Sequence, residues 1–217
     1  MRNLLNSLVI GLVVGSLITA PLAAAPAAPV ASPIGIILQA EKAQLSSGSA
    51  VDGASIYDGD RLSTSALGSL RASLGSSQAF LPAESSADFH QSARGFDANL
   101  NGGTIVLSTT SGQPFLLHAN GASIRPGTAQ MTIAQVTRVN ANELLLSSRK
   151  GTLEVSAEGE VRSIPEGSSY RMIIEPADPA SPQVAAGRNK IIWVLILLGG
   201  IGAGVGIWRA VISPDKP

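Results

Sequence analysis

Short runs of alternating apolar and polar residues dominate the middle of the chain, and turn-forming residues separate them. Between residues 34 and 175 no helical apolar period extends far enough to predict a helix. Alternation with a period of two places successive side chains on opposite faces of a strand, so each run predicts one strand. The runs are Thr104–Ser108, Pro114–His118, Ala122–Pro126, Met131–Val136, Glu143–Ser147, Thr152–Ser156, Glu160–Ile164 and Tyr170–Ile174.

Short strands at regular spacing are typical of an all-β domain, and we predict either a sandwich or a stacked, solenoid-like β-roll over residues 34–175. One internal echo favours stacking. Gly102–Ser108 (GGTIVLS) and Lys150–Ser156 (KGTLEVS) share Gly-Thr, an apolar residue, any residue, an apolar residue and Ser. Two copies do not establish a repeat, and two hairpins that start alike by chance would give the same echo.

Two stretches are predicted to lie outside the regular strands. Residues 78–99 lack clean alternation, which predicts a loop whose phenylalanines pack onto the sheet, namely Phe80, Phe89 and Phe96. Residues 176–189 (PADPASPQVAAGRN) are rich in Pro and Ala, cannot hold a strand ladder, and predict an extended spacer.

The N-terminal residues 1–27 have the layout of a secretory signal peptide. Arg2 comes first, an apolar run extends from Leu4 to Ile18, and a tract of small residues ends at Ala27, the predicted cleavage point. An uncleaved membrane anchor is the less favoured alternative, because the apolar run is short for a span.

Residues 190–212 predict a single transmembrane helix. The apolar run within them has one arginine, and about twenty helical residues cross a bilayer core. Trp193 and Trp208 lie near its ends and are the predicted interface anchors, since indole rings favour the headgroup level. The signal peptide would send the middle of the chain across the membrane and leave residues 213–217 as a short cytoplasmic tail.

Four glycines of this predicted helix have the small-xxx-small spacing that lets two helices approach closely. They are Gly200, Gly202, Gly204 and Gly206. The spacing predicts a homo-oligomer through the span, although glycine is also simply common in membrane helices.

Composition and motifs argue against catalysis. The formal net charge is zero, which predicts no nucleic-acid partner, and the chain has no cysteine for disulfides or thiolate metal sites. The two histidines, His90 and His118, have no acidic residues at ligand spacing. No Gly-x-Ser-x-Gly elbow or phosphate-binding glycine motif occurs in a suitable context. We therefore predict no enzyme and no catalytic, cofactor-binding or metal-binding residues.

The acidic motif Asp58–Asp60 (DGD) has two interpretations. Carboxylates around a glycine can begin a calcium loop, but the remaining oxygen ligands of an EF-hand do not follow. Asp-Gly is also a strong turn dipeptide, because glycine accepts a positive φ without strain. The sequence favours the turn.

Turn-and-strand motifs follow one another from Ile34 to Met172. They are DGDRLST with GSLRASLGSSQAFL, then LNGGTIVLS, FLLHANGASIRPGTAQMTI with Gly127 and Thr128, SRKGTLEV and IPEGSSYRM. In this order they resemble the FecR-type periplasmic domain family. The resemblance implies a non-enzymatic, all-β extracytoplasmic module, often a roll of stacked strands. In regulatory members such a module relays an outer-membrane receptor's signal to a sigma factor.

The order of the targeting segments departs from those regulators. They begin with a cytoplasmic sigma-binding segment and cross the membrane before the β domain. Here the predicted signal peptide comes first and the predicted span last, so control of a sigma factor is not carried over.

The leading functional prediction is a membrane-tethered binding or sensing module of the bacterial cell envelope. Its β domain would lie outside the cytoplasm (in the periplasm of a Gram-negative cell) and contact an envelope protein or polymer, since a strand edge can accept a partner strand. A self-assembling structural envelope protein is the alternative. A secreted hydrolase is a third hypothesis, and it would need a pocket joining His90 or His118 to a carboxylate.

Overall fold

A computed structural model describes residues 32–46, 48–93, 95–110, 115–175 and 190–196. Strands are the regular structure of these residues, with no helix among them, which confirms the all-β prediction. In chain order they are β1 (Gly35–Leu45), β2 (Gly48–Ser49), β3 (Ser55–Ile56), β4 (Arg61–Leu74), β5 (Ser77–Leu81), β6 (Ser86–Ser92), β7 (Gly95–Thr109), β8 (Phe115–Ala119), β9 (Ala122–Pro126), β10 (Thr132–Asn140), β11 (Glu143–Lys150), β12 (Leu153–Ala157), β13 (Glu160–Ile164), β14 (Ser169–Glu175) and β15 (Lys190–Ile196).

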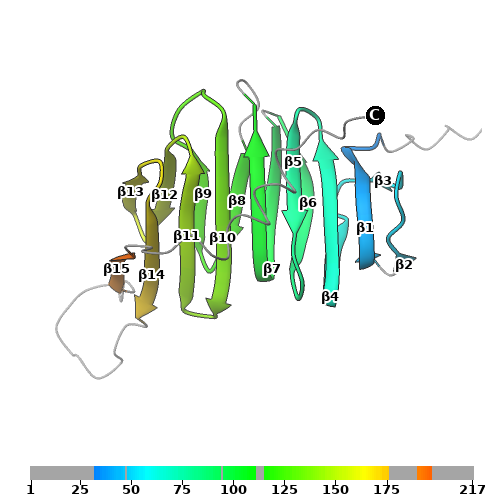
Figure 1. Ribbon diagram of the computed structural model, residues 1–217. Coiled ribbons are helices and arrows are strands. Elements are labelled where there is room, and N and C mark those ends of the chain that lie inside the picture. Colours follow the sequence, from blue (N-terminus) through cyan, green and yellow to red (C-terminus); the bar gives the residue numbers. More distant parts are fainter. Residues whose placement is uncertain (1–31, 47, 94, 111–114, 176–189, 197–217) are drawn as a thin grey trace, which may run out of the picture. The chain divides into compact units, whose positions relative to one another are not determined.

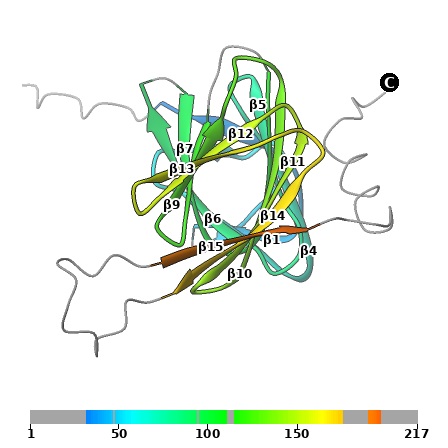
Figure 2. The same ribbon diagram turned by 90° about the vertical axis from the view of Figure 1, so that its left-hand side faces the viewer.

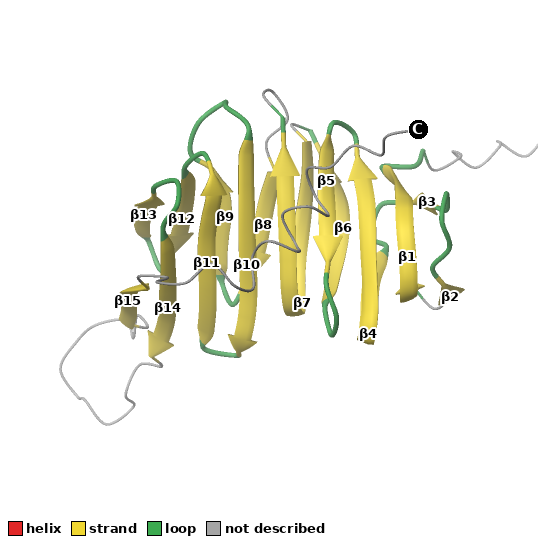
Figure 3. Cartoon of the chain, in the orientation of Figure 1, coloured by secondary structure: helices red, strands yellow, loops and turns green. Residues whose placement is uncertain are grey.

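All these strands belong to one hydrogen-bonded network that curls around a core (Figures 1 and 2). The first wall runs β13-β12-β9-β8 to the beginning of β7, and continues through β6 to the beginning of β4. The second wall runs β15-β14-β11-β10 to the end of β7, and continues through β5 to the end of β4. The long strands β4 and β7 therefore connect the two walls. Every pairing is antiparallel except that of β7 with β8 (Figure 3).

The core lies between the walls, and alternate side chains fill it. Phe96, Ala98 and Leu100 point inward from the first half of β7, whereas Ile105 and Leu107 point inward from its second half. The inward positions change from even to odd numbers because one extra residue, Asn101, is inserted where the register with β6 shifts. Such a bulge bends the strand and lets both halves bury apolar side chains.

The eight strands predicted from Thr104 to Ile174 are all present, from the second half of β7 to β14. The loop predicted for residues 78–99 is wrong, because β5, β6 and the first part of β7 occupy it. Phe89 and Phe96 are buried as expected, while Phe80 is half-buried. Many of the inward positions there are alanines, which a hydrophobic pattern scarcely registers: Ala79, Ala87 and Ala98.

Lys190–Ile196, at the start of the predicted transmembrane helix, form the strand β15 instead. Trp193, the predicted interface anchor, lies opposite Met172 of β14 and packs against the core. Isoleucine, valine and tryptophan favour strands, so local propensity permits this pairing. Within the described ranges no helix has the length and apolar character needed to cross a membrane.

Several predicted segments lie outside the described residues. They are the signal peptide (1–27), the spacer (176–189), the remainder of the span with Trp208 and the four packing glycines (197–212), and the short tail (213–217).

The two similar segments, Gly102–Ser108 and Lys150–Ser156, both need a positive φ at the glycine that precedes their threonine. Gly103 and Gly151 both have a φ of 71°, a conformation that glycine adopts without steric cost. A Cβ at Gly103 would lie 2.7 Å from the Cα of Ser85, and one at Gly151 would lie 2.9 Å from the carbonyl oxygen of Met131. In each case the glycine is pressed against the backbone of another segment.

Replacing Gly103 should therefore cost far more stability than replacing a glycine that has free space. We expect Gly103→Ala to lower the free energy of unfolding by about 3 kcal/mol, through backbone strain together with overpacking. Gly121 has a similar φ of 74°, but a Cβ at this position would have no atom within 4 Å, so Gly121→Ala should cost only about 1 kcal/mol. Urea unfolding of the purified chains measures both, and equal losses would contradict the close-packing argument.

Candidate functional site

The turn before β4 is held by its own carboxylates. The N–H of Asp60 donates to the carbonyl of Tyr57 at 3.1 Å, and Gly59 has a φ of 84°, which confirms the predicted turn. Asp60 accepts hydrogen bonds from the Tyr57 N–H and the Ser46 hydroxyl, both at 2.7 Å. Asp58 accepts one from the N–H of Gln91 at 2.8 Å. Both acidic residues thus fix the turn.

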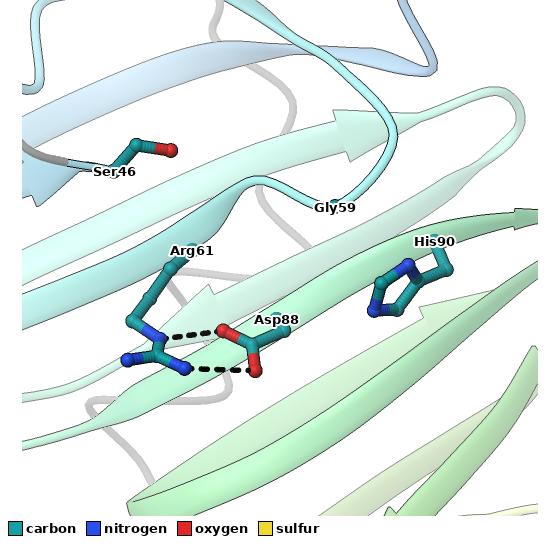
Figure 4. Close-up of a pocket in the computed structure, with 5 residues that line it drawn as sticks. All are labelled: Ser46, Gly59, Arg61, Asp88 and His90. Carbon is teal, nitrogen blue, oxygen red and sulfur yellow. Dashed lines mark hydrogen bonds and ion pairs between the residues drawn. The ribbon is translucent and has the colours of Figure 1, made fainter.

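A surface pocket of about 310 Å³ lies beside this turn (Figure 4). It brings together the loop after β1, the turn before β4 and the strands β4 and β6. Its lining residues are Ser46, Gly59, Arg61, Asp88 and His90.

Arg61 and Asp88 form a bidentate ion pair in the pocket, as Figure 4 shows. Nε of Arg61 donates to Oδ1 at 2.6 Å and Nη2 donates to Oδ2 at 3.2 Å, because the two residues are opposed in the β4–β6 register. The hydrogen bond from Arg61 is the largest influence on the pKa of Asp88 and lowers it, partial burial opposes it, and a hydrogen bond with Asn101 adds to the lowering. Asp88 is consequently an ionised carboxylate with its partner in place.

His90 lies near carboxylates and shares the pocket with the hydroxyl of Ser46. Its Nδ1 is 3.6 Å from Oδ1 of Asp58, and Asp97 is its register partner across β6 and β7. The pocket thus joins a histidine to a carboxylate, as the hydrolase hypothesis required. However, the Ser46 hydroxyl donates to Asp60 instead of His90, so the serine and histidine are not arranged for proton transfer.

From the pocket, a row of polar residues crosses the outer face of the first wall. Each member is the register partner of the next on the adjacent strand. All but Arg61, the first residue of β4, lie between two buried residues of their own strand, and Arg61 is followed by the buried Leu62. Strands lie about 4.8 Å apart, which sets the spacing of the row. We call this set the polar row: Arg61, Asp88, Asn99, His118, Ser123 and Ser156.

Further contacts order this face. Nδ1 of His118 lies 3.1 Å from the hydroxyl of Ser123, and Arg125 forms an ion pair with Glu154 next to the row. Alternation predicts that His118, Ser123 and Ser156 face outward, whereas Asp88 and Asn99 lie in the stretch predicted as a loop. In neither case does the pattern give the register between strands. The sequence therefore could not bring these positions together, nor place both histidines on one wall.

Across the residues that the structure describes, no three His, Asp or Glu side chains gather closely enough to hold a metal ion. Of the predicted site residues, Trp193 lies on β15, away from the pocket, and the others fall outside the described ranges.

Comparisons with known proteins do not assign a family. No protein-family model matches the chain, and no curated protein matches it, so the FecR resemblance stays a prediction. Two crystal structures, at 1.65 and 2.50 Å resolution, of a protein described as "a putative anti-sigma factor" from Parabacteroides distasonis ATCC 8503 are similar at 12% identity and a TM-score of 0.46. Each match covers 62% of this chain and 59% of the other, and this distant likeness carries no conclusion about function.

The ion pair of the pocket should make stability depend on pH. Because the pKa of Asp88 is lowered in the folded state, its stabilising contribution is present above the ordinary carboxyl pKa of about 4 and is lost as the pH falls through the lower, folded value. We expect Asp88→Asn to be less stable than the parent chain at pH 7, with the difference shrinking below pH 4. Denaturant midpoints across pH measure this. Asp97→Asn is the control on the neighbouring strand, and a pH-independent difference for Asp88→Asn would contradict the assignment.

Proposed function

We propose that this chain is a membrane-tethered, extracytoplasmic binding or sensing module of the bacterial cell envelope, non-enzymatic, that holds a protein or polymer partner on its polar row. The polar row is the observation that carries the proposal. Its side chains project from adjacent hydrogen-bonded strands whose opposite face is the core. A partner would therefore meet groups that are already positioned, at a reduced entropic cost.

The composition of this face suggests the chemistry of the partner. The charges of Arg61 and Asp88 compensate each other, as do those of Arg125 and Glu154, so the face has no strong excess of either sign. Amide, imidazole and hydroxyl groups complete the row: Asn99, His118, Ser123 and Ser156. Such groups favour a polar partner with hydrogen-bonding atoms and little net charge, such as a strand or loop of a protein or a hydroxyl-rich polymer.

A binding role without catalysis is favoured by how the pocket residues are already engaged. Asp88 is neutralised by Arg61, and the Ser46 hydroxyl is directed at Asp60. A general base would need a free, suitably placed acceptor next to a nucleophile. The pocket geometry thus supports recognition more than turnover.

The tether and the location rest on the two ends of the sequence. Residues 1–27 have the layout of a signal peptide, and residues 190–212 are long and apolar enough to span a bilayer as a helix. Together they would leave the β domain outside the cytoplasm. The FecR resemblance is consistent with this arrangement, whereas a sigma-factor link is not part of the proposal.

Self-assembly is the second candidate function. It is favoured by the apolar character of one edge strand, β15, in contrast to the charged edge strand β13. β13 and β15 each end the path of strands. β13 carries Glu160 and Arg162, and charged residues on an edge discourage pairing. β15 is apolar after Lys190, with Val194 43% and Leu195 49% exposed. An apolar edge of this kind can pair with a strand of another copy.

Partner capture tests the leading proposal. In crosslinking pull-downs of the full-length chain from native membranes, we expect one dominant envelope partner. The double variant Asn99→Ala/His118→Ala should reduce its recovery about tenfold or more, because two hydrogen-bonding groups are lost. Gln78→Ala/Ser108→Ala, a register pair on the second wall, is the matched control. Unchanged recovery with the polar-row variant would rule out this surface.

Edge pairing tests the second candidate. If β15 drives assembly, the purified chain should form larger species as its concentration rises in sedimentation velocity. Val194→Lys should abolish them by placing a charge on that edge. Val161→Lys is the control, since Val161 is 64% exposed on the other edge strand, β13. Assembly that persists with Val194→Lys, or that is lost with Val161→Lys alone, would contradict pairing through β15.

A further inference from the structure

β15 is bound to the rest of the sheet along its whole length. Its seven residues pair with β14 from Ser169 opposite Ile196 to Glu175 opposite Lys190. On the inner side, Ile191 and Trp193 pack against the core. The guanidinium of Arg162 lies 5.4 Å from the ring centroid of Trp193 and 5.0 Å from that of Tyr170. Arg162 thereby joins β13 to both β14 and β15 at the end of the sheet.

The same residues begin the apolar run that predicts the membrane span. As a helix, residues 191–212 would be about 33 Å long, enough for a hydrocarbon core of about 30 Å. If residues 191–196 stay in β15, residues 197–212 would reach only about 24 Å as a helix. The strand and the full-length span thus require the same residues and exclude each other.

We propose that residues 190–196 exchange between two positions, the last strand of the sheet and the first turns of the membrane span. This inference rests on the tether in the proposed function. Full insertion of the span removes β15 and leaves the backbone N–H and C=O groups along one side of β14 without their partner strand. The edge of β14 is then a strand-accepting site for an extended peptide.

The uncovered edge has the chemistry to recognise such a peptide. β14 turns Tyr170, Met172 and Ile174 toward the core side, where β15 now contributes apolar partners. A replacement strand would need apolar side chains at alternate positions, and a residue opposite Met172 could take the place of Trp193 beside Arg162. Main-chain hydrogen bonds to β14 would provide affinity, and the apolar side chains at alternate positions would provide selectivity.

In each of its two positions, the segment 190–196 lacks favourable contacts that the other position provides. In the strand, Val194 and Leu195 remain about half exposed to water, whereas a membrane helix would bury them in lipid. The helix instead loses the pairing with β14 and the contact of Trp193 with Arg162. The helix therefore buries apolar side chains that the strand exposes, and the strand keeps pairing that the helix loses. When two states compensate in this way, a partner or the membrane can shift the equilibrium between them.

A disulfide can hold the segment in the strand, because the chain has no cysteine of its own. Arg171 and Val194 are register partners on β14 and β15, and Val194 is exposed, so Arg171→Cys/Val194→Cys leaves the core unchanged. The matched control is Leu145→Cys/Arg171→Cys, which links β11 to β14 and leaves β15 free. Both full-length variants are reconstituted in vesicles, oxidised or reduced, and extracted with alkaline carbonate; thiol labelling measures disulfide formation.

The exchange predicts that the oxidised 171–194 variant is extracted from the vesicles and that reduction restores its resistance. The oxidised control should stay resistant throughout. Equal resistance of the oxidised 171–194 variant would show that the span does not need these residues, which would overturn the exchange and leave the tether intact. Failure of the 171–194 disulfide to form in detergent would overturn the strand state. Extraction of every variant in both redox states would instead refute the tether, and the exchange with it.

Discussion

The passage of β7 from one wall to the other is the constraint on which the rest of the structure depends. Both halves of this strand must bury apolar side chains, and the extra residue at Asn101 reverses which positions face inward. Gly103 then lets the chain lie close to the backbone at Ser85. β8 pairs with the first half of β7 and β10 with the second, so the registers of both walls are set from this bend. Asn99, in the polar row, lies before this bend and faces outward because it alternates with the buried Ala98 and Leu100.

The later strands were predictable because leucine, isoleucine and valine mark their inward positions clearly. Ala122–Pro126 and Glu160–Ile164 even have the bounds that alternation predicts. The strands within residues 78–99 were missed because alanine fills inward positions such as Ala87 and Ala98, and alanine contributes little to a hydrophobic pattern. The strand Lys190–Ile196 was missed for the opposite reason. A strand that is apolar on both faces shows no alternation, and in a longer apolar run it cannot be told from a helix.

The candidate site shows a different limit of sequence reasoning. Alternation correctly predicts that His118 points outward, but Asn99 lies in the stretch predicted as a loop. Neighbours across a sheet are set by register, which depends on bulges and turn lengths. The Arg61–Asp88 pair joins strands separated by a hairpin and a turn, and no local pattern links these two residues. The DGD turn was predictable because its chemistry is local: one glycine with a positive φ and a carboxylate that accepts from a nearby N–H.

The position of β15 at the end of the sheet also determines how this domain would respond to mechanical load. A pull transmitted through the chain at Ile196 reaches the sheet first at the pairing with Ser169. The hydrogen bonds between β14 and β15 would then be loaded starting from that end of the pair. Among the described strands β15 pairs with β14 alone, so it would be the first strand to separate, while β4 and β7 would still join the two walls.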